Sequence, residues 1–424
     1  MGKGEADIII IGGGAAGLMA AIGACKMGAK PVVLEKMPRP GRKIMITGKG
    51  RCNFTNVKDW NDFSPSIRSN THFVKPSFQN LKPVDVLDLL EENGLPYVIE
   101  RGGRAFPASY KASDVIDTLV RTANRGGAKI LTGKEVKSIE KKEKTFITRC
   151  TDGSEFLSKA VIIATGGLSY PSTGSTGDGY RIAGSFGHKI VECFPSLTAI
   201  VPEGYKAVSN KGHIDRQTPL SKFGKQLLGL QLKNVEISLF CGPDLVQQEF
   251  GDLDFTDGGL EGPIGFAISR NAVKGMLGGG KMKVVIDLKP AVEAEKLAAR
   301  IRREFPSPPF SYGNILAKLL PKALGPIFRQ LQPNPTPEAL AEALKSWTLP
   351  LQGYVGYERS VVTAGGVDTS EVSSHSLESR LCRNLFFCGE VLDIDANTGG
   401  YNLQCAFSTG MLSGMSAAAS VVRD

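Results

Sequence analysis

The sequence predicts an α/β protein whose main part is a Rossmann-like dinucleotide-binding domain assembled from both ends of the chain. Three observations indicate this. An apolar run, Ile8–Ile11, leads directly into a glycine-rich turn. A second apolar run, Pro31–Leu34, ends at the acidic residue Glu35. Two later apolar runs, 160–164 and 384–388, also end in glycine, as strands of a parallel sheet do where a ligand binds at their carboxyl ends.

The first glycine-rich turn is the strongest of these signals. A run of isoleucines without polar alternation is typical of a strand buried on both faces. Gly12 permits a tight turn, Gly14 lets a diphosphate approach the backbone, and Gly17 lets the next helix pack on the strand. The free N–H groups of that helix favour an anion. Because Glu35 stands where an acidic side chain accepts hydrogen bonds from a ribose, we interpret the turn as a dinucleotide site rather than a turn without a ligand.

The segment 36–56 follows and is too long for a simple connection. It is rich in Gly, Arg, Lys and Asn. Glycines let a backbone approach a ligand, and Arg42, Lys43 and Arg51 can neutralise phosphates. We therefore interpret the segment as a cofactor loop, with a mobile surface loop as the alternative.

The rest of the N-terminal part alternates helices and strands. Helical periodicity and capping residues predict helices, and apolar runs bounded by turn residues predict strands. The helices are expected at 83–93 and 113–124, and the strands near 129–131, 135–140, 145–150 and 155–157. Strand 160–164 then returns the chain to the nucleotide sheet, and strand 384–388 does so again before an Ala-, Ser- and Gly-rich helix near Asn402.

The region between these parts has a different character. It contains many prolines and no second glycine-rich fingerprint after a strand. Strand-like runs at 235–240 and 282–288 precede helix-like runs at 291–304, 313–320 and 337–347, with a Pro-rich link at 305–309. We predict a discontinuous nucleotide-binding domain (1–193 and 352–424), an inserted β-rich domain (194–290) and a small helical subdomain (291–351).

Composition narrows the class of protein further. The chain is 42% hydrophobic and 22% charged, as in ordinary soluble proteins. It shows no apolar run of membrane-spanning length, no secretion signal, and no CxxC or Cys/His metal spacing among its eight cysteines. These features predict a cytoplasmic protein with reduced thiols and without a membrane or metal site.

The net charge of +9 raises the question of a nucleic-acid partner. The densest basic run, 134–144, alternates with glutamates, and no RNA-binding motif accompanies it. We therefore favour a solvated surface and a small-molecule substrate over nucleic acid. The sequence leaves the oligomeric state open.

Several motifs together resemble one family. They are Gly41-Arg42-Lys43 through Gly50–Asn56, Ala164–Gly167 through Gly177-Asp178-Gly179, Gly365-Gly366-Val367, and Gly389–Asp393 through Thr398–Gln404. In these segments the chain resembles bacterial flavoproteins of the BaiN/YhiN type, also called aminoacetone-oxidase-family or NAD(P)/FAD-dependent oxidoreductases. The resemblance implies non-covalent FAD in a domain of the glutathione-reductase-like superfamily, an inserted β-barrel-like domain, a small helical subdomain, and NAD(P)H as a transient electron donor.

The resemblance also implies a role for individual residues. The diphosphate would lie at Gly12, Gly14 and Gly17, the ribose at Glu35, and the adenosine side at Arg42 and Lys43. The path toward the flavin would follow Thr47, Gly48, Gly50, Arg51, Cys52 and Asn53. The ribityl chain and pyrimidine edge would meet Gly389, Glu390, Gly400, Tyr401, Asn402 and Leu403. Further cofactor contacts are implied for Ala15, Ala16, Lys36, Val136, Ala164, Thr165 and Gly166.

One segment departs from the family pattern. Where relatives usually have Phe-Thr-His-x-Gly-x-Ser-Gly-Pro, this chain has Asp257 and Glu261 in place of the His and the Ser. If that His contacts the substrate in relatives, their substrate does not carry over to this chain.

No catalytic acid or base is assigned by the sequence. Tyr170 and Tyr401 are candidates for proton donors, with packing against the flavin as the favoured alternative. Cys52 is a candidate redox thiol, but it lacks a nearby second cysteine, so a packing or cofactor-contact role is favoured.

The leading expectation is an FAD-dependent oxidoreductase that acts on a small organic substrate. The resemblance suggests NAD(P)H-driven reduction of a conjugated C=C bond. Two alternatives stay open: an FAD amine oxidase that uses O₂, and a flavin-containing RNA-binding or regulatory protein, which only the charge favours.

Overall fold

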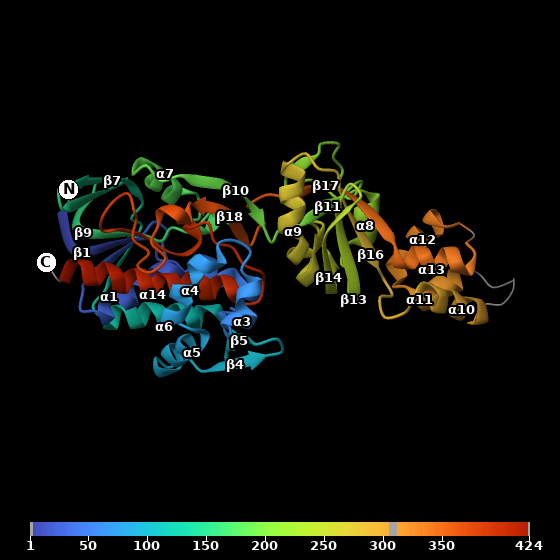
Figure 1. The fold of residues 1–424 in the computed structure, drawn as a ribbon, viewed down its shortest axis with the longest axis horizontal. Helices are drawn as coiled ribbons and strands as arrows, with labels where there is room; N and C mark the ends of the chain where they lie inside the picture. The colour runs from blue at the N-terminus through green and yellow to red at the C-terminus, as the bar shows by residue number, and fades with distance from the viewer. Residues whose placement is uncertain (1–2, 305–311, 334, 423–424) are drawn as a thin grey trace. The chain divides into compact units, whose positions relative to one another are not determined.

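The computed structural model describes residues 3–304, 312–333 and 335–422. The chain forms two compact units (Figure 1): unit 1 comprises Met1–Phe194 with Val362–Asp424, and unit 2 comprises Pro195–Val361. No helix within the described ranges has the length and apolar character needed to cross a membrane. The predicted Pro-rich link at 305–309 lies outside the described residues.

Unit 1 is built on a parallel sheet. Its strand order is β6-β2-β1-β9, and β19 pairs with the other side of β9. Ile8–Ile11 of β1 lie in register with Pro31–Leu34 of β2 and Ala160–Ile163 of β9, and all of these isoleucines are buried. The bounds are β1 Lys3–Ile11, β2 Pro31–Glu35, β6 Lys129–Thr132, β9 Glu155–Ile163 and β19 Leu385–Phe387.

The prediction of separate strands at 155–157 and 160–164 is wrong, because both belong to β9. Ser158 interrupts the apolar pattern but continues the pairing, since it lies opposite Ala6 of β1 and Phe146 of β8 (Thr145–Cys150). β8 also pairs with β7 (Val136–Lys142). β9 thus pairs with β1 along its whole length, while its other side meets the antiparallel meander in the first half and β19 in the second.

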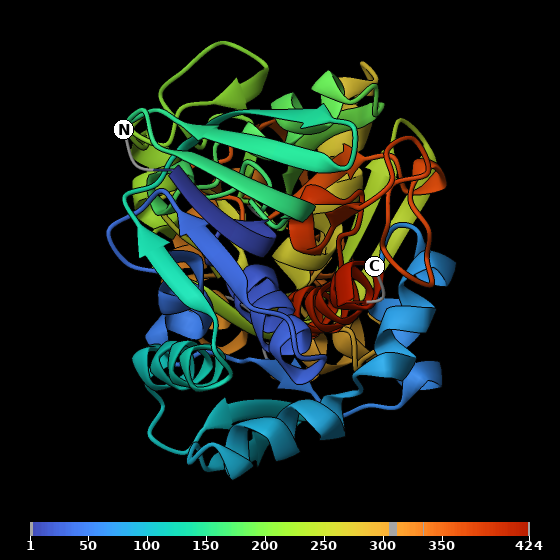
Figure 2. The same cartoon turned by 90° about the vertical axis from the view of Figure 1, so that its left-hand side faces the viewer.

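Two helices lie side by side against this sheet (Figure 2): α1 (Ala15–Lys26) and α14 (Tyr401–Val422). Their backbones touch at glycines. A Cβ at Gly410 would lie 2.3 Å from the Ala16 oxygen, and one at Gly414 would lie 2.0 Å from the Ala20 oxygen. Any larger residue would push the helices apart, so these glycines hold the C-terminal helix against the N-terminal one.

The remaining elements of unit 1 surround this core. The predicted helices 83–93 and 113–124 correspond to α5 (Pro83–Glu92) and α6 (Ala112–Arg125). A small antiparallel sheet has the order β3-β5-β4, with bounds Thr55–Asn56, Arg104–Pro107 and Tyr97–Glu100. The other elements are α2 Arg42–Ile46, α3 Trp60–Phe63, α4 Thr71–Asn80, α7 Asp178–Ser185, β10 Ile190–Ser196 and β18 Val362–Val367.

Unit 2 contains a sheet that closes on itself. The order β11-β15-β14-β13-β16-β17 returns to its start because β11 also pairs with β17, and β12 adds to β17. The strands are β11 Ile200–Pro202, β12 Gly212–Ile214, β13 Gln231–Cys241, β14 Asp244–Phe255, β15 Leu260–Glu261, β16 Met282–Asp287 and β17 Trp347–Val355.

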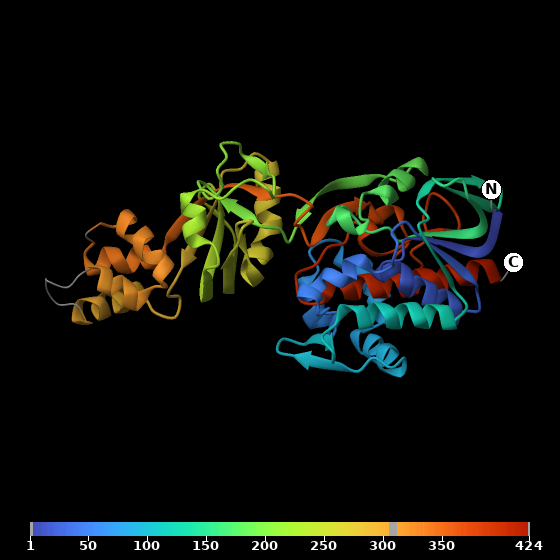
Figure 3. The ribbon, with the colours of Figure 1, turned by 180° about the vertical axis from the view of Figure 1, so that it is seen from behind.

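The helices of unit 2 pack with this sheet. Figure 3 shows α10–α13 (orange) grouped together, and their buried side chains belong to the same hydrophobic cluster as the strands. The Phe328 and Trp347 rings, for example, lie 5.9 Å apart. The bounds are α8 Lys222–Leu227, α9 Gly262–Leu277, α10 Ala294–Glu304, α11 Tyr312–Leu319, α12 Gly325–Leu331 and α13 Pro337–Lys345.

The division into units differs from the predicted boundaries in two respects. The chain returns to unit 1 at Val362 rather than at 352, because β17 continues to Val355 within the sheet of unit 2. The segments predicted as separate β-rich and helical domains fall within one compact unit, because they share a core.

A buried histidine links distant segments of unit 1. His188 Nδ1 lies 3.2 Å from Glu371 Oε2, and Nε2 lies 2.7 Å from Ser379 Oγ. The Phe387 ring packs edge-on at 4.8 Å between centroids. Burial lowers the pKa of His188 below its ordinary value of 6.5, against the opposing effect of the Glu371 carboxylate. The imidazole is therefore neutral in the folded protein at neutral pH.

Because the pKa of His188 is lowered in the folded protein, we expect the protein to lose stability in acid. The unfolded chain binds a proton to His188 as pH falls through 6.5, whereas the folded chain binds it only at lower pH. The free energy of unfolding should therefore fall below that pH, by at most about 1.4 kcal/mol per pH unit from this group. Urea titrations at several pH values should show a shallower slope for His188→Gln. Ser379→Ala keeps the buried imidazole and should keep the slope. Equal slopes for wild type and His188→Gln would contradict this role.

Candidate functional site

The turn between β1 and α1 has the features of a diphosphate cradle. Gly12 has φ +101°, and a Cβ there would lie 2.5 Å from the Ala164 oxygen. A Cβ at Gly17 would lie 1.9 Å from the Gly12 oxygen. Gly14 is different, because it precedes α1 without a side-chain cap and a Cβ there would meet no atom within 4 Å. The space beside Gly14 is thus open and no side chain caps α1, as an anion at a helix N-terminus requires.

Glu35 lies at the carboxyl end of β2 beside this turn. Its Oε2 accepts the Gly13 N–H at 2.7 Å, and its Oε1 accepts the Met37 N–H at 2.7 Å. Burial raises the pKa of the Glu35 carboxyl, and the two N–H groups oppose that rise. Each carboxylate oxygen has a lone pair left, so Glu35 can hold the loop in place and still accept from a ribose hydroxyl.

Lys36 is turned toward a different segment. Its Nζ lies 2.6 Å from Asp178 Oδ2 and 2.5 Å from Thr176 Oγ1. Lys36 therefore joins the end of β2 to the start of α7 and to the loop before it. Val136 begins β7 and is buried. The backbone N–H of Lys134, two residues earlier, donates to the backbone oxygen of Glu35. This hydrogen bond brings the start of β7 beside the same turn.

The loop 41–53 is fixed to the cradle and has an unusual backbone. The Gly41 N–H donates to the Gly13 oxygen at 2.9 Å. Gly48, Lys49, Gly50 and Cys52 all have positive φ, which is strained for Lys49 and Cys52. Asn53 Oδ1 is buried without a hydrogen-bond partner among the described residues. An unsatisfied buried acceptor in such a loop fits a site that is completed by a bound cofactor.

Lys43 and Glu390 form the centre of a network that joins four segments. Lys43 Nζ lies 2.7 Å from Glu390 Oε2, and Glu390 Oε1 accepts the Thr363 N–H at 2.8 Å. Thr363 Oγ1 in turn accepts the Leu168 and Ser169 N–H groups at 2.8 and 3.1 Å. Sequence reasoning did not identify Thr363 or Ser169. The only sequence signal was their position beside the glycine motifs at 165–167 and 365–366.

The C-terminal residues reach the same place through close backbone contacts. A Cβ at Gly389 would lie 2.6 Å from the Ala16 Cβ, so Gly389 lies against the first turn of α1. Gly400 lies against Thr55, where a Cβ would lie 2.4 Å from the backbone. The structure thus brings Ala16, Ala164, Gly389 and Gly400 together with the loop 41–53. These residues are far apart in the sequence.

The Tyr401, Asn402 and Leu403 side chains have packing roles. Tyr401 is buried with its ring 4.9 Å from Phe63. Asn402 Oδ1 accepts the Ala396 N–H, and its Nδ2 donates to the Ala396 and Asn397 oxygens. Leu403 packs against the core of unit 1. Tyr170 has φ +51°, and its backbone oxygen accepts from Thr173.

Cys52 does not have the properties of a redox thiol. Its side chain is fully buried, and burial raises the pKa of the thiol to about 12. Because the thiolate is the reactive form, the structure favours the packing role for Cys52. Among the described residues, no group of three or more His, Cys, Asp and Glu side chains could hold a metal ion.

In unit 2 the two departures from the family motif share one partner. Arg359 Nη1 lies 2.7 Å from Asp257 Oδ1, and its Nε and Nη2 bind both oxygens of Glu261. Burial alone would lower the pKa of Arg359, but the Glu261 and Asp257 carboxylates raise it. Two carboxylates at these positions therefore hold a half-buried arginine.

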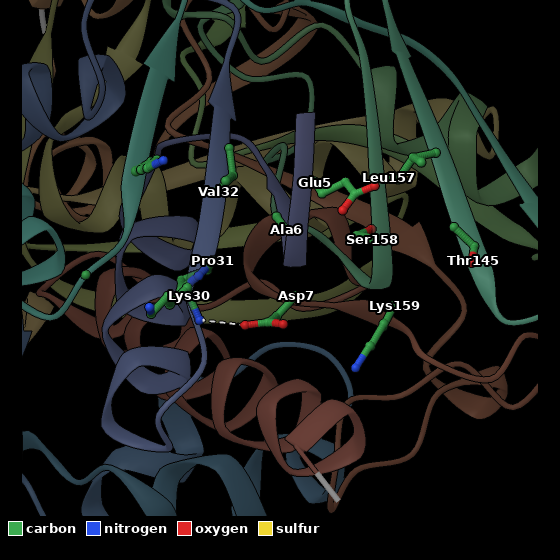
Figure 4. Close-up of a pocket in the computed structure, with 12 residues that line it drawn as sticks. Glu5, Ala6, Asp7, Lys30, Pro31, Val32, Thr145, Leu157, Ser158 and Lys159 are labelled. Carbon is green, nitrogen blue, oxygen red and sulfur yellow. Dashed lines mark hydrogen bonds between the residues drawn. The ribbon is translucent and has the colours of Figure 1, made fainter. Parts of the chain in front are cut away.

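A hollow in unit 1 lies away from the turn at Gly12–Gly17. It has a volume of about 530 Å³ and lies at the amino ends of the sheet strands. Figure 4 shows Asp7 and Lys159 at its border, with the Lys30 N–H donating to Asp7. Ligands of open α/β sheets bind at the opposite, carboxyl ends of the strands, so this hollow does not belong to the cofactor site.

Comparison with known proteins identifies the class. A family model described as HI0933-like protein Rossmann domain matches residues 6–416. A 3-dehydro-bile acid delta(4,6)-reductase of Clostridium scindens is 32% identical over 423 residues, covering 96% of this chain and 98% of the relative. A ribosomal RNA dihydrouridine synthase of Haemophilus influenzae is 32% identical over 416 residues, covering 95% of this chain and 96% of the relative.

A solved structure shows the same fold. The FrdA subunit of Escherichia coli quinol fumarate reductase matches with a TM-score of 0.50 and 16% identity, covering 100% of this chain and 71% of that one. The fold and the family match together define an FAD-dependent oxidoreductase. The chain belongs to the HI0933-like Rossmann family.

The open space at Gly14 makes a sharp prediction. Gly14 has φ −81°, a conformation that alanine adopts, so Gly14→Ala should fold with an unchanged melting temperature. Its methyl group would fill the cradle, and we expect the Kd for FAD to rise at least about tenfold. Flavin absorbance per protein and fluorescence titration of the apoprotein measure this.

Gly17→Ala is the matched contrast. Its methyl group would collide with the Gly12 oxygen, so that variant should lose thermal stability as well as FAD. If Gly14→Ala kept FAD with wild-type affinity, the diphosphate would not lie at this turn.

Proposed function

We propose that this protein reduces a C=C bond conjugated to a carbonyl group in a small organic substrate, with NAD(P)H as the electron donor. The similarity to the delta(4,6)-reductase over 96% of the chain carries this proposal. The substrate gains a hydride and a proton, and the nicotinamide loses the hydride and becomes NAD(P)⁺. FAD, when bound, supplies the reversible two-electron transfer that side chains cannot perform.

The chain's own residues bind and orient this cofactor. The amides at the start of α1 and the open space at Gly14 receive the diphosphate. Glu35 is positioned by two backbone N–H groups to meet the ribose. Lys43, fixed by Glu390, places an ammonium charge in the same site, which favours a diphosphate.

The proposal predicts that NADH or NADPH reduces the bound flavin directly. Under anaerobic conditions either nucleotide should bleach the absorbance near ~450 nm, and adding an enone should restore it. Wild-type protein kept without nucleotide is the control. A bound flavin that neither nucleotide bleaches, but that an amine reduces and O₂ reoxidises, would contradict the reductase and support the amine oxidase.

A second candidate substrate is a uracil base in RNA. A relative named ribosomal RNA dihydrouridine synthase is as similar as the delta(4,6)-reductase, and the net charge of +9 suits a polyanion. Uracil contains a C=C bond conjugated to a carbonyl group, so the chemistry would be the same. The two proposed functions therefore share the same reaction, reduction of a conjugated C=C bond. They differ in whether that bond belongs to a small molecule or to a base in RNA.

This candidate predicts reduction of uridine in RNA. Protein loaded with FAD and supplied with NADPH should convert uridine to dihydrouridine in ribosomal RNA that lacks the modification. A mass increase of about 2 Da in nuclease fragments detects the two added hydrogens, and the Gly14→Ala variant is the control. No mass change together with enone reduction would exclude RNA as the substrate.

A further inference from the structure

A cationic and aromatic surface of unit 1 lies beside the cofactor loop. The hairpin of β4 and β5 lies at the helical side of unit 1 (Figure 1). The hairpin contacts the loop 41–53 at Gly48. A Cβ built at Gly48 would lie 3.6 Å from the Phe106 ring. The surface consists of Lys49, Arg51, Arg101, Arg104, Tyr110 and Lys111, and we refer to it as the arginine–tyrosine patch.

Stacked guanidinium groups form the centre of the patch. Arg51 Cζ lies 4.8 Å from the centroid of the buried Phe106 ring and 5.7 Å from that of Tyr110. Arg104 Cζ lies 5.9 Å from the Phe106 centroid. Both arginines also bind Glu100, at 3.4 and 3.2 Å. Phe106 and Glu100 thus fix the guanidinium groups of Arg51 and Arg104 in place.

These groups remain accessible to a partner. The Arg51 and Arg104 side chains are 46% and 42% exposed, and Tyr110 is 38% exposed. Tyr110 also has φ +53°, a conformation that is costly for an aromatic residue. Met45 and Ile46 on the adjoining loop are 45% and 41% exposed. Tyr110, Met45 and Ile46 therefore add exposed apolar surface to the hairpin and the loop that carry these cations.

The charge of the patch favours an anionic partner. Lys49, Arg101 and Lys111 are exposed and add to the two stacked arginines. The carboxylates beside them are those of Glu100 and Asp114, and Asp114 accepts a hydrogen bond from Ser109. The five cations of this surface therefore outnumber these two carboxylates and come from three chain segments. The point at which Arg51 and Arg104 converge is already occupied by Glu100.

We propose that the arginine–tyrosine patch binds single-stranded RNA. Bases stack on aromatic rings and on guanidinium planes, and lysine and arginine side chains contact phosphates. A compact anion would need converging donors, and a duplex would hide the base faces, so single-stranded RNA fits the arrangement best. The proposal rests on the second candidate function, uracil reduction in RNA, and adds the surface that holds the substrate strand.

The proposal is tested by measuring the affinity of the FAD-loaded protein for a labelled single-stranded RNA 12-mer. Fluorescence anisotropy gives this affinity at several salt concentrations. Tyr110→Ala combined with Arg104→Gln should weaken binding at least about tenfold and lower the salt slope by about one. Arg149→Gln and Phe250→Ala change an exposed arginine and an exposed phenylalanine elsewhere and should change binding less than about twofold. Bound FAD and melting temperature show whether each variant is folded.

The outcomes separate this proposal from the function on which it rests. Equal RNA affinity of the patch variant and wild type would overturn the patch, and so would wild-type protein that does not bind the 12-mer. Wild type that binds RNA through the patch but reduces no uridine would overturn uracil reduction alone. Weakening by the control variants to the same degree would show nonspecific attraction and would also overturn the patch.

Discussion

The direct contact between the backbones of α1 and α14 is the constraint on which unit 1 depends. At Gly410 and Gly414 any side chain would collide with backbone oxygens of α1. This contact brings the last helix onto the first, Gly389 lies against Ala16 in the first turn of α1, and Gly400 lies against Thr55. A site made from both chain ends needs such a contact, because its two halves are joined only through an inserted unit.

A hydrogen-bonded network fixes the contributing segments in the same place. Glu390 accepts from Lys43 and from the Thr363 N–H, and Thr363 accepts from Leu168 and Ser169. Each of these groups lies within two residues of a glycine motif. The network explains why a charged pair is tolerated in a half-buried site: both charges are partnered before a cofactor enters. The ammonium group of Lys43 can then meet a diphosphate without free rotation of its side chain.

Sequence patterns were most informative for elements whose formation depends on residues close together in the sequence. The isoleucines of β1, the helices α5 and α6, and the meander of β7 and β8 were all predicted near their observed positions. The division of β9 was wrong, because Ser158 and Lys159 break the apolar run while the strand continues its pairing on both sides. α9 was missed, although Pro263 in its first turn is a typical start of a helix.

The sequence by itself determined the buried strand β1, the glycine-rich turn after it, the acidic residue after β2 and the resemblance to the family, because these depend on residue types at fixed spacings along the chain. Only the tertiary structure decided what individual side chains do. It turned Lys36 toward Asp178, buried Cys52 with a thiol pKa of about 12, packed Tyr401 on Phe63, and joined Asp257 and Glu261 to Arg359. The physical reason is that these contacts join residues far apart in the sequence, and spacing along a chain carries no information about which distant groups meet.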